Sequence, residues 1–244
     1  MKEVRFFYNP TPLSGMLPPD EAQHATRVLR LGVGDEIFIM DGLGNFHRAT
    51  VSEATNHRCC YSIDSSEPQQ REWQGAIHLA LAPTKNIDRT EWFAEKATEI
   101  GIDSISLLDC RNSERRVVKT ERIHKILIAA TKQSRKAWLP QLNDMQSFDA
   151  FIGTTALPRQ RFIAHCHEGR RPFLGDLLKP NTDALVLIGP EGDFTPDEVR
   201  HAETAGFISV SLGTSRLRTE TAALVATHLM RLANRINEQT DTDE

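Results

Sequence analysis

The chain beyond residue 75 repeats one pattern, in which a short apolar run is followed by a helical segment. The apolar runs read IHLALA, SISLLD, RFIAHC, ALVLIG and FISVSL, and they show little alternation of polar and apolar residues. Such runs are typical of strands that are covered on both faces of a parallel sheet. Because strands and helices alternate along the chain, we predict an α/β domain with about five parallel strands.

Two of the helical segments carry recognisable signals. In TPDEV, Thr195 can cap a helix, Pro196 fits its first position, and Glu198 completes a capping box. In DRTEWFAEKATEIG, Trp92 and Phe93 fit an apolar stripe that faces a core. We therefore predict a helix at each place, with Trp92 and Phe93 buried.

The first 70 residues follow a different pattern. The short runs VRFFY, EIFIM, FHRATV and CCYSI, separated by turn residues, indicate a small, mostly β barrel. One helical stretch at 19–31 interrupts them and is expected to present His24, Arg27 and Arg30 outward. The polar segment 65–75 is typical of a linker. The predicted domains are therefore 1–70 and 75–238.

Positive charge is concentrated in one segment. The formal net charge is −4 over 244 residues, yet segment 109–140 holds nine basic residues against three acidic ones. A local excess of this kind attracts a polyanion, although a solvated helix face gives the same pattern. Trp138 adjoins the excess, where stacking on a base is an alternative to a core position.

Several classes of protein lose support from the sequence. No run approaches the roughly 20 apolar residues of a membrane span, and the start lacks a secretion signal, so we expect a cytoplasmic protein. The four cysteines form no CxxC pair, which argues against a disulfide framework and a zinc site. His165, His167 and Glu168 could ligate a metal, but a pair of histidines at a spacing of two at a strand end is more typical of structural or pocket-lining residues, so we expect no metal.

Two glycine-bearing loops follow apolar runs near the C-terminus, GPEGDF at 189–194 and GTSRLRTE at 213–220. Ligands of open α/β sheets bind beyond the carboxyl ends of the strands, and glycine lets the backbone approach them closely. The chain lacks the GxGxxG, GxxxxGK[ST], HExxH and GxSxG motifs. A nucleoside carrier such as S-adenosyl-L-methionine fits this pattern, and simple turns before helices are the alternative.

Motifs along nearly the whole chain share one order with a known family. They are Arg5-Phe6, HATRVLR at 24–30, Lys85, EKATEIG at 95–101, KQSRKAWLP at 132–140, IGPEG at 188–192 and LGTSRLRTETA at 212–222. With them the sequence resembles the ribosomal RNA small subunit methyltransferase E family, the 16S rRNA (uracil-N3)-methyltransferases of the SPOUT superfamily. Asp193-Phe194 and KQSRK depart from the usual family residues.

The resemblance implies a fold and a cofactor. It implies an N-terminal PUA-like RNA-binding β-barrel and a C-terminal SPOUT α/β domain with a parallel sheet and a deep trefoil knot, acting as a homodimer on the small ribosomal subunit. It also implies that S-adenosylmethionine lies bent in the knot. Its pocket would be formed by Leu187, Ile188, Gly189, Gly192, Leu212, Gly213, Leu217 and Ala222.

Residues for catalysis and RNA binding follow as hypotheses. Arg218 is the candidate to stabilise the uracil anion, and Glu220 to accept the N3 proton. Arg218 could instead hold a phosphate or cross the dimer interface. For Glu220 the alternative is a purely structural role as a cap of the last helix. Attack by nitrogen requires no cysteine nucleophile. The RNA-binding candidates are Arg5, His24, Arg27 and Arg30 on the barrel and Arg111, Arg115, Arg116, Lys132 and Arg135 on the catalytic domain.

Three other interpretations remain open at this point. A related SPOUT enzyme would act on tRNA or on another rRNA base. A non-catalytic RNA-binding assembly factor would keep the fold without the reaction. An enzyme of ordinary Rossmann topology would use Asp109 on a ribose, but no glycine fingerprint precedes it.

Overall fold

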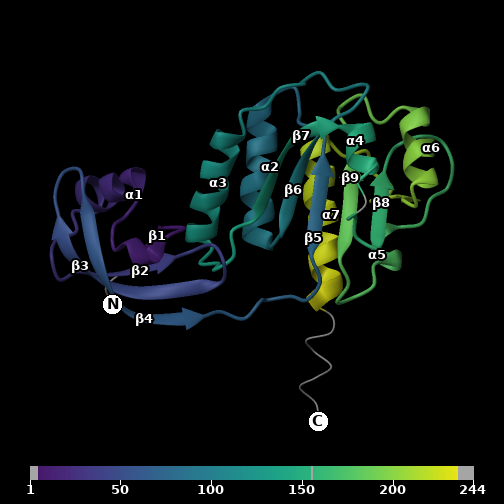
Figure 1. Cartoon of the computed structure of the whole chain (residues 1–244). Coiled ribbons are helices and arrows are strands. Elements are labelled where there is room, and N and C mark those ends of the chain that lie inside the picture. The colour runs from purple at the N-terminus through teal and green to yellow at the C-terminus, as the bar shows by residue number, and fades with distance from the viewer. Residues whose placement is uncertain (1–4, 155, 236–244) are drawn as a thin grey trace, which may run out of the picture. The chain divides into compact units, whose positions relative to one another are not determined.

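The computed structural model describes residues 5–154 and 156–235, which fall into two compact units (Figure 1). The first unit holds the described residues up to Arg71 together with Ile128–Leu139. The second holds Glu72–Leu127 and the described residues from Pro140 onward. Within the predicted catalytic segment 75–238, residues Ile128–Leu139 group with the first unit.

The first unit is built on a four-stranded sheet of order β1-β2-β3-β4. Its strands are β1 (Phe6–Tyr8), β2 (Glu36–Met40), β3 (Asn45–Ala54) and β4 (Cys59–Pro68). β1 and β2 are parallel, and the other pairs are antiparallel. The predicted mostly β unit is confirmed. The predicted linker at 65–75 starts too early, because β4 continues through Pro68.

Helical turns cover the core of this sheet. A 3₁₀ helix (Pro12–Ser14) comes first, and α1 (Pro19–Gln23) continues directly into a π-helical turn (His24–Val28). Ala22 and Ala25 are buried in one cluster with side chains of the sheet, whereas several other side chains of this helical stretch are exposed. The exposed ones include His24, Arg27 and Arg30, so their outward orientation is confirmed.

The second unit contains a fully parallel six-stranded sheet of order β10-β8-β9-β5-β6-β7 (Figure 1). Its strands are β5 (Ile77–Leu81), β6 (Ser104–Asp109), β7 (Gln141–Ser147), β8 (Gln160–Ala164), β9 (Ala184–Ile188) and β10 (Ile208–Val210). Five strands coincide with the five apolar runs. The sixth, β7, is a polar edge strand whose sequence QLNDMQS lacks the apolar signal.

Helices connect these strands. They are α2 (Ile87–Ile100), α3 (Thr120–Gln133), α4 (Phe148–Ile152), α5 (Leu174–Leu177), α6 (Pro196–Thr204) and α7 (Thr219–Arg235). α7 packs against α2, β5 and β9. The capping box of α6 is confirmed, with Thr195 and Glu198 bonded reciprocally. Among the described residues, no helix combines the length and apolarity that a membrane crossing needs.

One residue of α2 departs from its prediction. Phe93 is fully buried, but Trp92 is 43% exposed. Adjacent helical residues point about 100° apart, so the two rings cannot both face one core. The prediction of a buried Trp92 is therefore wrong.

His78 of β5 makes stability depend on pH. Its Nε2 lies 2.8 Å from Ser106 Oγ, and burial lowers the pKa of the imidazole from 6.5 to about 4. Between these values the unfolded chain binds more protons, so the free energy of unfolding falls as the pH falls. We expect His78 to remove roughly 2 kcal/mol between pH 7 and pH 5. Urea unfolding of wild type and His78→Gln at both pH values measures this, and an equal pH response in the two proteins would contradict it.

Candidate functional site

A cavity of about 900 Å³ lies at the carboxyl ends of β8, β9 and β10 in the second unit. Its walls are the loop after β9, the loop after β10, the first turn of α7 and the residues that follow β8. This volume is within the range of ligand-binding pockets. The two glycine-bearing loops that the sequence singles out therefore line one shared cavity, as expected for the carboxyl edge of a parallel sheet.

Hydrogen bonds hold the loop after β9 in place. Asp193 has a left-handed backbone (φ 62°), and its Oδ2 accepts from the backbone N–H of Cys166 at 2.7 Å. Asn112 Nδ2 donates to the carbonyl oxygens of Gly192 and Asp193, each at 3.1 Å. Glu191 Oε1 accepts from the backbone N–H of Lys85 at 2.9 Å. The loop is thus fixed from three other segments, which pre-organises its backbone for a ligand.

Most of the predicted cofactor residues line this cavity. They are Ile188, Gly189, Gly192, Leu212, Gly213, Leu217 and Ala222. Leu187 does not line it, because its fully buried side chain belongs to the core cluster that includes Leu185 and Phe194. Successive side chains of a strand point to opposite faces, so Leu187 and Ile188 cannot both face the cavity.

The two predicted catalytic residues lie on one wall of the cavity. Arg218 is exposed, and among the described residues no ion pair or hydrogen bond engages its guanidinium. Glu220, in the first turn of α7, is only 8% exposed. Its Oε1 lies 3.8 Å from the Nε of Arg89, a residue of α2 that the sequence had not indicated. The cavity wall therefore carries a free cation and a buried carboxylate.

A second wall comes from the segment after β8. His165 and His167 line the cavity, as the pocket-lining interpretation expects. His165 Nε2 lies 3.1 Å from Ser209 Oγ, and burial, followed by the charge of Arg171, lowers the pKa of its imidazole. His167 Nε2 donates to the carbonyl of Phe194 at 2.7 Å. Within the described ranges no group of three or more potential ligands is arranged to hold a metal ion.

Further lining residues were missed by the sequence interpretation. They include Arg89, Cys166, Arg171 and Ser211, whereas Pro190, Asp193 and Arg216 lie in the two glycine-bearing loops that the sequence singles out. Those next to strand ends follow the same carboxyl-edge rule as the glycine loops, so that rule could have found them. Arg89 also belongs to this edge, because α2 follows β5, the neighbour of β9, but no glycine-bearing loop marks its position in the sequence.

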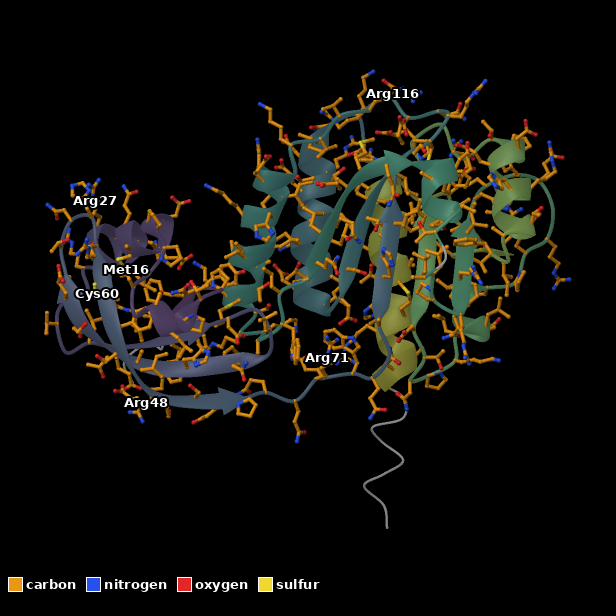
Figure 2. All side chains as sticks on the ribbon, in the orientation of Figure 1. Met16, Arg27, Arg48, Cys60, Arg71 and Arg116 are labelled. Carbon is orange, nitrogen blue, oxygen red and sulfur yellow. The ribbon has the colours of Figure 1, made fainter. Side chains whose placement is uncertain are left out.

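The predicted RNA-binding residues of the first unit differ in their contacts. Arg27 and Arg30 are exposed and have no ion-pair partner in the described part of the chain, and Figure 2 marks Arg27 at the surface. Arg5 donates to the carbonyl of Leu29 at 3.2 Å. Lys132 is 21% exposed and pairs with Glu21 at 2.6 Å. The other two candidates, His24 and Arg135, are exposed, and Arg135 lies over the ring of Phe6 at 6.0 Å.

The three candidates of the second unit follow β6. The side chain of Arg111 is exposed and makes no hydrogen bond with the described residues. Arg116, labelled in Figure 2, pairs with Asp109 at 2.6 Å. Arg115 donates to the carbonyls of Thr84 and Lys85 at 3.1 and 2.6 Å. Arg115 therefore braces the loop after β5, and Arg111 offers the more available charge.

Comparison with known families gives two matches. Residues 71–231 match the RNA methyltransferase domain, and residues 17–63 match the RNA methyltransferase PUA domain. The first match spans most of the chain and contains both cavity loops. The N-terminal unit is therefore PUA-like, and the parallel sheet belongs to an RNA methyltransferase domain.

Individual relatives agree with these matches. The ribosomal RNA small subunit methyltransferase E of Synechocystis sp. is 31% identical over 84% of this chain and 69% of its own length. A probable rRNA methyltransferase structure from Porphyromonas gingivalis is 41% identical, covers 96% of this chain and 100% of its own, and has a TM-score of 0.90. The ribosomal RNA small subunit methyltransferase E of Neisseria gonorrhoeae, solved with bound S-adenosyl methionine, is 28% identical. Its structure covers 94% of this chain and 98% of its own, with a TM-score of 0.82. With these motifs, this fold and this cavity, the chain belongs to the ribosomal RNA small subunit methyltransferase E family.

Proposed function

We propose that the protein transfers a methyl group from S-adenosylmethionine to N3 of one uridine in the 16S rRNA of the small ribosomal subunit. The observation that carries this proposal is the shared cavity of the IGPEG and LGTSRLRTETA loops. The relative from Neisseria gonorrhoeae, whose structure holds S-adenosyl methionine, supports the cofactor. The names of the curated relatives support the small-subunit RNA as substrate.

The residues of the cavity fit this cofactor. Ile188, Leu212 and Leu217 offer apolar contacts for its nucleoside, and the glycine loops expose backbone groups for its polar edges. Gly189 and Gly192 are closely packed on one side, because an added Cβ would lie 3.1 Å from Phe194 or Asn112. The loops therefore bring backbone, rather than side chains, to this wall.

In the reaction, Glu220 accepts the N3 proton and Arg218 donates hydrogen bonds to the uracil carbonyl that gains negative charge. When bound, S-adenosylmethionine supplies the methyl group, whose bond to sulfur breaks with the electron pair left on sulfur as carbon bonds to N3. Holding the base and the donor close together supplies much of the rate. Burial raises the pKa of Cys110, so this thiol is poorly suited as a nucleophile, and attack by nitrogen needs none.

RNA placement rests on exposed basic residues of both units. His24, Arg27 and Arg30 would contact the RNA backbone from the PUA-like unit, and Arg111 from the methyltransferase unit. Arg135 is a fifth exposed contact. Contacts of this kind position an RNA without reading its sequence. Arg5, Arg115, Arg116 and Lys132 make contacts within the protein, so they would act by holding neighbouring segments.

The assembly proposed for the protein is a homodimer with a deep trefoil knot at the cofactor loops. Exposed Trp92 on α2 and Leu232 on α7 support a protein contact, because these two helices pack against each other and both side chains are apolar. Sedimentation equilibrium distinguishes a dimer from a monomer. A ribosomal substrate would place the protein in the cytoplasm.

Mapping the product tests the function. Small subunits from a strain that lacks the modification are incubated with the protein and S-adenosylmethionine, digested with nuclease and analysed by mass spectrometry. We expect one methyl group, on N3 of a single uridine. A methyl group on another base or only on tRNA would favour another RNA methyltransferase. Loss of both product and cofactor binding in calorimetry would favour a non-catalytic RNA-binding factor.

A further inference from the structure

Glu220 holds a buried oxygen atom without a partner. The residue is 8% exposed and lines the cavity, and its Oε2 has no hydrogen-bond partner in the described residues. Its Oε1 lies 3.8 Å from the Nε of Arg89, which is too far for a hydrogen bond. Buried carboxylate oxygens are normally satisfied by donors. The free Oε2 therefore indicates a hydrogen-bond donor that belongs to a ligand.

Arg89 lies beside Glu220 and is a hydrogen-bond donor, whereas the carboxylate is an acceptor. It lies in the first turn of α2, whose start is capped by the side chain of Asn86. Its guanidinium makes no hydrogen bond with the described residues, and it lines the same cavity as Glu220. Arginine can only donate, and an ionised carboxylate can only accept. The two helix starts thus place a donor and an acceptor side by side on one cavity wall.

This pair matches one edge of uracil. Uracil carries a donor, N3–H, between two carbonyl acceptors, O2 and O4. In cytosine the arrangement is reversed, because N3 is an acceptor and the neighbouring amino group, N4, is a donor. A carboxylate facing N3 of cytosine would leave two acceptors opposed, and a guanidinium facing its amino group would oppose two donors. Such mismatches are disfavoured, most strongly at Glu220, whose side chain is only 10% exposed.

We propose that Arg89 and Glu220 form the uracil-reading pair of the enzyme, in which Glu220 Oε2 accepts from N3–H and Arg89 donates to O4, the carbonyl oxygen that an amino group replaces in cytosine. This inference rests on the proposed function and adds to it the basis of base selection. It assigns Arg89, which lies far in sequence from both cofactor loops, to substrate specificity. It also explains why an acceptor is left open in a cavity wall.

The test compares two kinds of small subunit that differ only in having U or C at the mapped position. Dissociation constants are measured with S-adenosylhomocysteine present, so that binding is separated from transfer. We expect wild type to prefer U by roughly 10- to 100-fold, and Arg89→Ala to reduce this preference about tenfold. Arg89→Lys, which keeps the charge but loses the fork of donors, should give an intermediate value.

The carboxylate is tested by a variant of the same shape. Glu220→Gln can present a donor in place of an acceptor, so its preference for U should fall toward equality with C. Affinity for S-adenosylhomocysteine should change less than about threefold in all three variants. Arg200→Ala on α6 and Glu95→Gln on α2 serve as matched controls, because they remove the same charges at residues that do not line the cavity.

Two outcomes would overturn the inference. In the first, Arg89→Ala binds the U and C subunits with the wild-type ratio. In the second, Glu220→Gln loses cofactor affinity but keeps the preference for U, which would assign its carboxylate to the cofactor's ammonium group. Failure of the proposed function is recognised separately, because wild type would then place no methyl group on N3 of uridine in the mapping experiment.

Discussion

Gly44→Ala is expected to lower the free energy of unfolding of the first unit by roughly 3 kcal/mol, from overpacking combined with backbone strain. Gly44 precedes β3 with a φ of 105°, and an added Cβ would lie 2.2 Å from Cζ2 of Trp138. The backbone N–H of Gly44 also donates to the carbonyl of Ala137 at 3.1 Å. The substitution therefore forces the ring away from the strand or breaks this contact.

Gly34→Ala separates the two causes of this loss. Gly34 also has a positive φ, 90°, but an added Cβ would have no neighbour within 4 Å. Only backbone strain remains there, so we expect a loss of about 1 kcal/mol. Urea unfolding followed by tryptophan fluorescence measures both variants. Equal losses would show that the packing of Trp138 on Gly44 contributes nothing.

The same contacts limit the role of Trp138. The guanidinium of Arg71 lies 4.4 Å from the centre of its ring, and the ring also contacts Gly44. Stacking on an RNA base would require one of these contacts to be displaced. The ring therefore serves the packing of the first unit, which is the core alternative that the sequence left open. Position beside a basic run did not distinguish the two, because it says nothing about which faces of a ring are covered.

The sequence predicts the parallel sheet well where its strands are buried. β9 is buried at every residue, and its sequence ALVLI is a short continuous apolar run, which is the pattern expected of a strand covered on both faces. β7 is missed because it pairs with β6 alone and none of its residues is fully buried. An edge strand of this kind needs little apolar surface, so its position is decided by its neighbour rather than by its own composition.

Only part of the candidate site could be predicted from the sequence, because some of its residues are brought together by packing between elements. The glycine loops could be found because the carboxyl edge of a parallel sheet collects the segments that follow its strands. Arg89 follows β5 at the same edge, but no glycine-bearing loop marks it, and its meeting with Glu220 depends on the packing of α2 against α7. In the basic segment, composition alone does not predict which arginines are available to bind RNA. Arg115 bonds to two backbone carbonyls while Arg111 remains available, and the two are equivalent in a count of charges.

Two roles are possible for Glu220, stabilisation of the start of α7 and catalysis as a base, and they predict different effects of its substitution. An acidic residue in the first turn of α7 interacts favourably with the helix dipole, which contributes about 0.3–1 kcal/mol to stability. That role places no requirement on a free oxygen in the cavity. A base that accepts the N3 proton, by contrast, must face the substrate with one oxygen uncommitted, as Glu220 Oε2 does.

Glu220→Ala is therefore expected to reduce the single-turnover rate of methyl transfer by about 10²–10⁴-fold, the usual contribution of a positioned base. Glu220→Gln should lose a similar factor while keeping the shape of the side chain. Arg218→Ala, which removes the donor proposed to stabilise the anion, should lose about 10²–10³-fold. The rates are measured with saturating small subunits and S-adenosylmethionine, so that weaker binding does not contribute. A Glu220→Ala protein that melts at a lower temperature but transfers methyl groups within threefold of wild type would assign the carboxylate to the start of α7 alone.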